Sequence, residues 1–563
     1  MANWRTKTIP EIIQDIKNRR IVLPVIQRRL VWDEDKMTAL FESLMKKNSF
    51  GGIICINQPK DSSPLFAFRE FSNDGSPRQS IENTVTNTDM LFVLDGQQRL
   101  QSFYIGFDGA YNQKSLYFNL FSNIENDEFD FKFAANSQQL IGNNTLINLF
   151  ERQEWYSAKA LFDELCSVND VRKVTRNIAE ELRISDRGDY YLIEDNVTRF
   201  YDVAVREQTI GLSVVDFDRT NVTRSRQKIV EMFRVLNNGG TVLTSYDLMA
   251  STLKGFDARM ERLLDELSAS PIGINQDAVI KLLIILFGDP LKQKEVTDLR
   301  EENSKAALNN EARLKLTLKL LEKFLEATGH ADWFQSPRKK SYIPIYFMAY
   351  YIFYRYSDRA AEEIEALEAE IDARQFSADF AAMRQWLYYS LLNGTFSSGS
   401  GWRPSTTGLN EIYKVMRDHQ SADFPLASLQ TLYTTRLHSF ITTVDPITLD
   451  AFDRDYLFYL IYDCQTKYLG VNFERDHIHP RVLVDSPRVN SIGNFEILTR
   501  ADNRLKSDIE FEEWINAKCS SPAEVDKYCK EHLIPADRAL WRHDRFDDFL
   551  DARLNLIVAK VAL

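Results

Sequence analysis

The chain has 563 residues, 44% of them hydrophobic and 27% charged, a composition typical of an ordinary soluble protein with roughly two to four domains. Its net charge of −12 argues against a surface that is basic all over, although a local basic groove for DNA stays open. No apolar run is long enough to span a bilayer, and the first residues have no signal-peptide core. The five cysteines are scattered and include no Cys-x-x-Cys pair, so we expect reduced thiols, a cytoplasmic location and no zinc knuckle.

The first part of the chain predicts a mixture of strands and helices. Short apolar runs at 51–56, 90–94 and 210–217 are typical of buried strands. After the second run, Asp95 and Gly96 predict a sharp turn, and the residues that follow predict a helix. A strand, a glycine turn and a helix start together make a place where phosphate can bind.

Three motifs lie in this part: LPVIQRRLVW at 23–32, LDGQQRL at 94–100 and FRVLNNGG at 233–240. In the second motif, Arg99 has the planar group that can hold a phosphate with two hydrogen bonds. From residue types alone, however, Asp-Gly is an ordinary turn and Asn-Gly-Gly an ordinary helix end, so structural roles are the simpler interpretation. The chain has no Gly-x-x-x-x-Gly-Lys-Ser/Thr run, which excludes a P-loop.

The middle of the chain predicts a helical scaffold. The segment EARLKLTLKLLEKFLEA at 311–327 has apolar residues at three- and four-residue spacing, and residues 360–374 alternate acidic patches with apolar positions. Residues 395–407 are rich in Ser, Gly and Thr and are the best candidate for a linker.

The most informative motif lies near the C-terminus, where Asp476 directly precedes His477, and Asn494, Asn503 and Lys506 follow. Hydrolysis of a phosphodiester needs an activated water and a cation that neutralises the phosphate. A neutral imidazole suits the first task, and a hard cation such as Mg²⁺, which binds oxygen ligands, suits the second. This set of residues therefore predicts metal-assisted cleavage of a phosphodiester. Each Asn alone is also compatible with a turn or cap role.

Local structure around this motif can also be predicted. If residues 471–480 carry a strand, Asp476 and His477 point to opposite sides unless the strand twists or loops there. Pro480 ends or bulges that strand. Residues 495–509 predict a short strand followed by a helix. His479 is expected to be structural rather than catalytic.

The C-terminal motif resembles the HNH domain of GmrSD-type restriction endonucleases, whose ββα-metal fold carries His-x-x-Pro, Gly-Asn and further Asn and Lys positions. The resemblance implies that His477 is the general base, that Asn494 holds this histidine, and that Asp476 and Asn503 bind Mg²⁺ or Mn²⁺. Lys506 belongs to the same catalytic set.

The three N-terminal motifs resemble the conserved blocks of the GmrS-type domain, across roughly residues 9–255. That domain has a ParB/sulfiredoxin-like fold, and its members bind or hydrolyse nucleotides. The resemblance implies a site for a nucleoside triphosphate with the following residues: Asp95, Gln98 and Arg99 lining it, and Gln27 and Arg28 nearby.

We therefore expect an α+β multidomain protein with a GmrS-type NTPase or sensor domain at 1–255, a helical scaffold at 256–400 and a GmrD-type HNH nuclease domain at 401–563. The expected function is a nucleotide-responsive, metal-dependent endonuclease that restricts double-stranded phage DNA, including modified DNA, with no membrane partner and with homodimerisation left open. Two alternatives stay open: a toxin-like HNH nuclease that ignores modification, and a nucleotide-controlled DNA clamp that does not cut.

Overall fold

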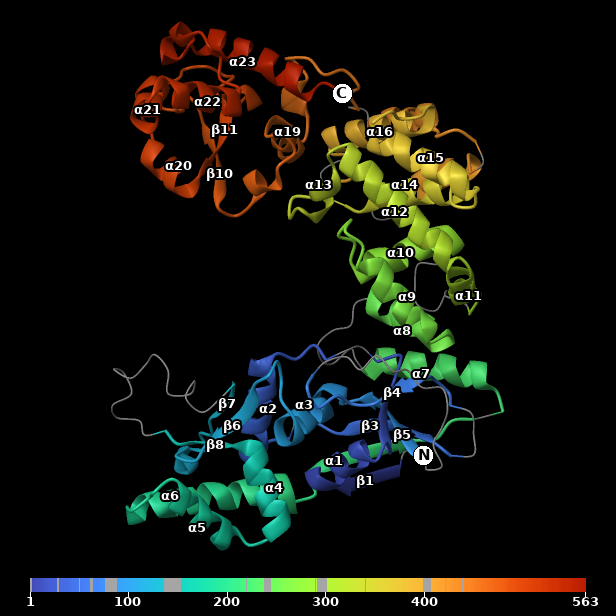
Figure 1. Cartoon of the computed structure of the whole chain (residues 1–563), viewed down its shortest axis with the longest axis vertical. Coiled ribbons are helices and arrows are strands. Elements are labelled where there is room, and N and C mark those ends of the chain that lie inside the picture. The colour runs from blue at the N-terminus through green and yellow to red at the C-terminus, as the bar shows by residue number, and fades with distance from the viewer. Residues whose placement is uncertain are drawn as a thin grey trace. The chain divides into compact units, whose positions relative to one another are not determined.

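The structure is a computed structural model in which the chain forms two compact units (Figure 1). Unit 1 is Met1–Glu261 with Glu295–Ser304, and unit 2 is Arg262–Lys294 with Lys305–Leu563. The finer division into three domains stays a prediction. The residues that the structure describes are 3–27, 30–49, 51–60, 64–75, 89–135, 153–218, 220–236, 245–288, 290, 301–339, 341–397, 407–420, 422–437 and 440–563.

Unit 1 is built around a six-stranded mixed sheet. In order across the sheet, the strands are β1 (Asn3–Lys7), β9 (Ile210–Val215), β3 (Ile53–Gln58), β5 (Met90–Asp95), β2 (Ile21–Pro24) and β4 (Phe68–Arg69). β9 runs parallel to β3 and β5 parallel to β2, whereas the other neighbours are antiparallel. The three predicted apolar runs form β3, β5 and β9, so these strand predictions are confirmed.

Both faces of this sheet are buried. Side chains alternate along each strand, so neighbouring residues pack on opposite faces. On β5, Val93 belongs to one hydrophobic cluster, whereas Phe92 and Leu94 belong to another. The first cluster is covered by α1 (Ile9–Lys17), α2 (Glu34–Met45) and α3 (Gln97–Asp108), and the second includes Ile229 of α7 (Val222–Leu236). Burial on both faces explains why these strands are continuous apolar runs in the sequence.

A smaller antiparallel sheet and a group of helices complete unit 1. β6 (Ser115–Asn119) lies between β7 (Phe131–Ala134) and β8 (Trp155–Ser157). The helices of this part are α4 (Ala158–Val168), α5 (Val171–Glu181) and α6 (Arg187–Phe200), and a π-helical segment, Tyr201–Arg206, leads from α6 back to β9.

The described residues between Ser245 and Ile461 form mainly helices. The helix α12 (Glu311–Ala327) spans the residues whose periodicity predicted it. α14 (Ile343–Arg355) is buried along most of its length and contacts α10, α12 and α17. Within the described residues, no helix is long and apolar enough to cross a membrane. The remaining helices are α8 (Ser245–Phe256), α9 (Arg259–Ser268), α10 (Gln276–Phe287), α11 (Glu301–Asn309), α13 (Ala331–Gln335), α15 (Ala361–Asp372), α16 (Ala378–Leu392), α17 (Leu409–Asp418), α18 (Leu426–Leu437) and α19 (Arg454–Ile461).

The C-terminal part of unit 2 holds a two-stranded antiparallel sheet surrounded by helices (Figure 1). β10 (Phe473–His477) pairs with β11 (Phe495–Thr499), and α20 (Arg500–Lys506) follows at once, so the predicted strand and helix are confirmed. β10 ends three residues before Pro480, which cannot continue a ladder. The helices α21 (Phe511–Lys518), α22 (Pro522–His532) and α23 (Phe546–Val561) supply the rest of the local core.

Candidate functional sites

β10 places Asp476 and His477 on opposite faces of the small sheet. In the register of the two strands, Asp476 lies opposite Glu496 and His477 lies opposite Phe495. The imidazole of His477 packs on the ring of Phe495, with 4.3 Å between centroids. The predicted divergence of the two side chains is confirmed, and the pair lies where the chain leaves the sheet.

Lys506, on the last turn of α20, lies on the same face of the β10–β11 sheet as the side chain of Asp476. Its side chain is completely buried. The ammonium donates hydrogen bonds to the carboxylate of Asp476, to the backbone carbonyl of His477 and, at 2.9 Å, to Oε1 of Glu496. All three of its N–H groups thus have acceptors, as a buried ammonium requires. Burial raises the pKa of Asp476, and the charge of Lys506 offsets only part of this shift.

Glu496 is held in turn by the C-terminal helices. It is completely buried, and its Oε2 accepts a hydrogen bond of 2.5 Å from Tyr528 on α22 and lies 3.5 Å from Nδ1 of His532. Burial alone would raise the pKa of this carboxyl, but the adjacent ammonium, His532 and Tyr528 outweigh it and hold the pKa below its ordinary value. Arg553 on α23 donates to the carbonyls of His532 at 2.9 Å and Gly493 at 2.8 Å. Sequence reasoning did not find this network.

His477 is arranged as a neutral base. Its Nε2 lies 3.1 Å from Oδ1 of Asn490, and because that oxygen can only accept, Nε2 carries the proton and Nδ1 keeps its lone pair. Burial lowers the pKa of His477 below its ordinary value. The ring is therefore neutral at pH 7, which is the form that can take a proton. Asn490 was not among the predicted residues.

Asn494 holds the backbone after His477 rather than the imidazole itself. Its side chain is completely buried and accepts from the N–H of His479 at 2.9 Å, while its Nδ2 donates to the carbonyls of His479 at 3.1 Å and Val489 at 2.9 Å. The ring of His477 is bonded by Asn490 instead. The preceding Gly493 packs so closely on α23 that a Cβ there would lie 2.6 Å from Leu550, which explains a glycine before Asn494.

Asn503 lies in the same strand–helix interface as Asp476. Its Nδ2 donates to Oε2 of Glu474 at 2.8 Å, and Glu474 also pairs with Arg500 at 3.1 Å. Glu474 and Asp476 are two residues apart on β10 and so share a face, just as Asn503 and Lys506 share a face of α20. Sequence reasoning missed Glu474, although its position two residues before Asp476 on a strand indicates that the two side chains share a face.

The N-terminal candidate site lies at one edge of the large sheet. β2 and β5 are parallel neighbours, so their carboxyl ends lie at the same edge. Gly96 follows β5 with a φ of +86° and begins α3, so the predicted strand, turn and helix are confirmed. A Cβ at Gly96 would lie 2.2 Å from Ile53, so both the backbone angle and the space require glycine.

The predicted residues that the structure describes come together there, but their hydrogen bonds are made within the protein. Gln27 is buried and donates to the carbonyls at positions 93 and 94 at 2.9 and 2.6 Å, and Gln98 accepts from the backbone N–H groups at positions 31 and 32. Arg99 pairs with Asp95 at 3.2 Å. Its guanidinium also approaches Gly51, where a Cβ would lie 2.6 Å from Nη1. Arg28 and the motif residues 237–240 lie outside the described residues.

The comparison with known families concerns this N-terminal region. Residues 9–254 match the family model described as GmrSD restriction endonuclease, N-terminal domain. No curated protein matches the chain. Over residues 9–254 the chain is thus similar to the N-terminal domain of the GmrSD restriction endonucleases, and this similarity supports a restriction endonuclease of that type.

Proposed function

We propose that the chain is a metal-dependent endonuclease that hydrolyses phosphodiester bonds of double-stranded DNA in its C-terminal part and responds to a nucleotide bound by its N-terminal domain. The target that the family resemblance suggests is phage DNA, including modified DNA. One observation carries the proposal: Lys506 bonds both the carboxylate of Asp476 and the carbonyl of His477. The same ammonium thereby bonds the side chain of a candidate metal ligand and the backbone, not the imidazole, of a candidate base, whose ring lies on the other face of the sheet. Asn503 lies on the same helix as Lys506.

The oxygen atoms around Asp476 fit a hard divalent cation. Carboxylate and amide oxygens are the ligands that Mg²⁺ and Mn²⁺ prefer. Because Nδ2 of Asn503 donates to Glu474, the carbonyl oxygen of that amide is the atom left to bind a cation. Asp476 and Asn503 would hold the cation, with Glu474 orienting the amide.

Such a site depends on ligands from outside the protein as well. Within the described residues, no three or more His, Cys, Asp and Glu side chains are grouped as a metal centre. Water and phosphate oxygens would therefore complete the ligand set, which is common for Mg²⁺. The cation, when bound, would neutralise charge on the scissile phosphate and the leaving oxygen.

His477 would activate the attacking water. Its Nδ1 would accept a proton from the water as the oxygen of that water attacks phosphorus. The bond from phosphorus to the leaving oxygen would break, and that oxygen would take up a proton from solvent. The imidazolium that forms would keep its Nε2–H bonded to Asn490. The Asn490 side chain would therefore hold the ring in both protonation states. The hydrogen bonds of Asn494 to His479 would hold the turn that follows the base.

The N-terminal domain would bind the phosphates of a nucleoside triphosphate at the start of α3. Backbone N–H groups at a helix N-terminus favour an anion, and Arg99 lies in the first turn of this helix. Asp95 pairs with Arg99 in the structure. When a nucleotide binds, Asp95 would either keep the guanidinium of Arg99 in place or hold a cation bound to the nucleotide.

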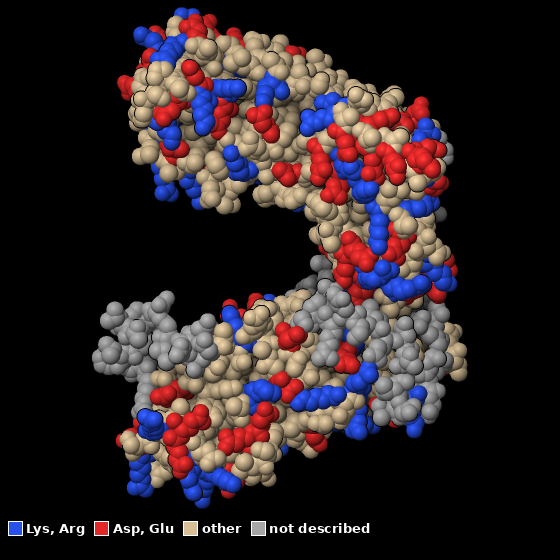
Figure 2. Space-filling view, viewed as in Figure 1, with Lys and Arg blue, Asp and Glu red and all other residues tan. Residues whose placement is uncertain are grey.

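The charge distribution limits where DNA can bind. In the basic run at the end of α1, Lys17 pairs with Asp108, Arg19 with Glu70 and Arg20 with Asp15, so these residues offer little net attraction for phosphate. Figure 2 shows acidic side chains gathered over α15, whereas Lys and Arg are mixed with acidic residues over the C-terminal helices. DNA should therefore bind away from α15. The exposed acidic residues of α15 are Glu362, Glu363, Glu365, Glu370 and Asp372.

A plasmid-cleavage assay tests the proposal. The purified chain is incubated with supercoiled DNA, unmodified or carrying modified cytosine, in Mg²⁺, Mn²⁺ or EDTA, with and without ATP, GTP or CTP. We expect nicked or linear product that needs the cation, changes with a nucleotide and is lost in His477→Ala. His419→Ala, which removes the histidine that directly follows α17, is the matched control and should cut like the parent.

The other hypotheses give different outcomes in the same assay. Tight binding of the plasmid without cleavage under any cation or nucleotide would favour a DNA clamp. Equal cleavage of modified and unmodified DNA, unaffected by nucleotide, would favour a toxin-like nuclease. Undiminished cleavage by His477→Ala would overturn the assignment of the base.

A further inference from the structure

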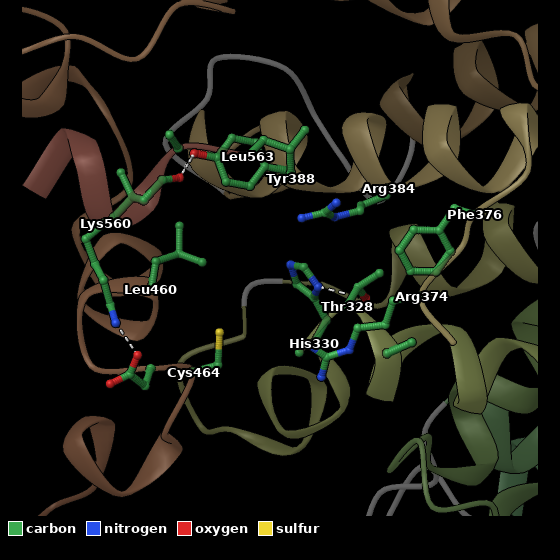
Figure 3. Close-up of a pocket in the computed structure, with 15 residues that line it drawn as sticks. Thr328, His330, Arg374, Phe376, Arg384, Tyr388, Leu460, Cys464, Lys560 and Leu563 are labelled. Atoms are coloured by element: carbon green, nitrogen blue, oxygen red, sulfur yellow. Dashed lines mark hydrogen bonds and ion pairs between the residues drawn. The ribbon is translucent and has the colours of Figure 1, made fainter. Parts of the chain in front are cut away.

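A cavity of about 450 Å³ lies within unit 2, and none of its lining residues belongs to β10 or β11 (Figure 3). Four parts of the chain line it: the residues after α12, the segment from the end of α15 into α16, the end of α19 with the turn after it, and the end of α23. Its size is within the range of sites for small molecules, which is about 300–1,000 Å³. The cavity takes no part in the nuclease proposed above.

The lining of the cavity is basic. Arg374, Arg384 and Lys560 contribute to it, against Asp463 as the single side-chain carboxylate among the lining residues. That carboxylate is already bonded to Lys560. Neither arginine has an ion pair or a side-chain hydrogen bond among the described residues, and Figure 3 shows both guanidinium groups reaching toward His330. Arg374 is exposed and Arg384 half-buried, so two guanidinium groups without an ion pair in the described part of the chain border the cavity and can hold an anion there.

His330 contributes shape rather than charge. It is buried, its Nδ1 lies 3.1 Å from the hydroxyl of Thr328, and its Nε2 lies 2.6 Å from the hydroxyl of Tyr456. Burial, together with the charge of Arg384, lowers the pKa of His330 to about 4, so the ring is neutral at pH 7. Both of its nitrogens are used, so the ring offers no hydrogen-bond donor to a ligand.

The other walls are apolar and aromatic. The ring of Phe376 lies 5.9 Å from the guanidinium carbon of Arg384, and Tyr388 and Leu460 line the cavity from two further helices. Tyr388 is fixed by a hydrogen bond of 2.5 Å from its hydroxyl to the carbonyl of Val561. A ligand that fits must therefore have an apolar portion as well as an anionic end.

We propose that this cavity binds a small organic phosphate, with the phosphate held by Arg384 and Arg374 and an apolar or ring portion against Phe376, Tyr388 and Leu460. Arginine suits this task because its planar group makes two parallel hydrogen bonds to phosphate oxygens. The binding does not depend on nuclease activity, so failure of one proposal leaves the other intact.

Calorimetric titration of the full chain tests the proposal, with phenyl phosphate as the probe and inorganic phosphate and a short DNA duplex as comparisons. We expect saturable binding of one phenyl phosphate per chain, weaker binding of inorganic phosphate and no displacement by the duplex. Arg384→Gln and Arg374→Gln should each weaken binding by about tenfold or more. Arg359→Gln, at an exposed arginine that pairs with Glu363, is the matched control and should bind like the parent.

Cysteine alkylation of the parent gives a readout that needs no variant. Cys464 lines the cavity, whereas Cys166 is exposed in unit 1. Phenyl phosphate should slow the alkylation of Cys464, followed by mass spectrometry, and leave that of Cys166 unchanged. The proposal is overturned if phenyl phosphate does not bind at millimolar concentration, if both arginine variants bind as the parent does, or if the duplex displaces the probe.

Discussion

The Nζ of Lys506 lies 2.9 Å from Oε1 of Glu496, and both side chains are completely buried. The same ammonium bonds Asp476 and the carbonyl of His477. This ion pair therefore links the core of the C-terminal part to the geometry of the candidate nuclease site. A buried pair of this kind adds little net stability, but removing one partner leaves an unpaired charge in the core.

Replacing Lys506 by Met should destabilise unit 2 by roughly 3–5 kcal/mol, because Glu496 would remain buried without its cation. Lys518→Met is the matched control: Lys518 is partly exposed and pairs with Asp502 at the surface, so its loss should cost less than about 1 kcal/mol. Urea unfolding followed by tryptophan fluorescence measures both. Adding Glu496→Leu to Lys506→Met should restore part of the lost stability. Equal stability of Lys506→Met and Lys518→Met would contradict the prediction.

Asn490 and Asn494 should have separable effects. Asn490 is exposed and bonds the ring of His477, so Asn490→Ala should leave stability within about 0.5 kcal/mol and lower DNA cleavage by roughly tenfold or more. Asn494 is buried and makes three hydrogen bonds to backbone, so Asn494→Ala should cost about 2–4 kcal/mol. Urea unfolding and plasmid cleavage on the same preparations check this. The assignment of the two roles fails if the stability loss falls on Asn490→Ala instead.

His479 should make the C-terminal part sensitive to acid. Its ring is buried among Phe511, Phe546 and Phe549, and neither ring nitrogen has a hydrogen-bond partner among the described residues. Burial, with the charge of Lys506, lowers its pKa from 6.5 to about 4. The unfolded chain therefore takes up this proton at a higher pH than the folded chain does, and stability that is complete above pH 6.5 is lost progressively between about 6.5 and 4.

The variant His479→Phe tests this source of acid sensitivity, since a phenyl ring suits the same aromatic surroundings and does not titrate. The urea midpoint of the parent should fall from pH 7 to pH 5 more steeply than that of the variant. The pKa of His330 is also lowered to about 4 by burial, so the urea midpoint should still fall somewhat with pH in both proteins. Parallel pH profiles for parent and His479→Phe would show that acid acts elsewhere.

Sequence reasoning succeeded where a feature depends on neighbouring residues. The turn at Gly96 follows from the Asp-Gly pair, because glycine readily adopts a positive φ. The helix α12 follows from apolar residues at three- and four-residue spacing along one segment. Sequence reasoning considers a strand within 471–480 and predicts a strand and a helix from 495 onward, and the structure has all three. The register that places Asp476 opposite Glu496 could not be predicted, because it depends on pairing between distant segments.

The features that were missed come from long-range packing. Asn490 lies in an irregular loop without periodicity, and only the folded loop brings it to the ring of His477. Gln27 and Gln98 were predicted to be near a nucleotide, yet their bonds to the backbone could be seen only once β2, β5 and α3 were assembled. The cavity lined by Arg374 and Arg384 uses four distant parts of the chain, so no sequence motif marks it.

Arg99 provides the last prediction, because it separates a nucleotide site from a purely structural ion pair. If the start of α3 binds phosphate, Arg99→Ala should weaken binding of a fluorescent nucleoside triphosphate by about tenfold or more, since a charged, two-pronged contact is lost. Arg206→Ala, which removes an exposed arginine paired with Asp202, is the control and should bind like the parent. If Arg99 serves only to hold Asp95, Arg99→Ala and Asp95→Ala should lower the melting temperature and leave nucleotide binding unchanged. A parent protein that binds none of ATP, GTP and CTP would also favour the structural role.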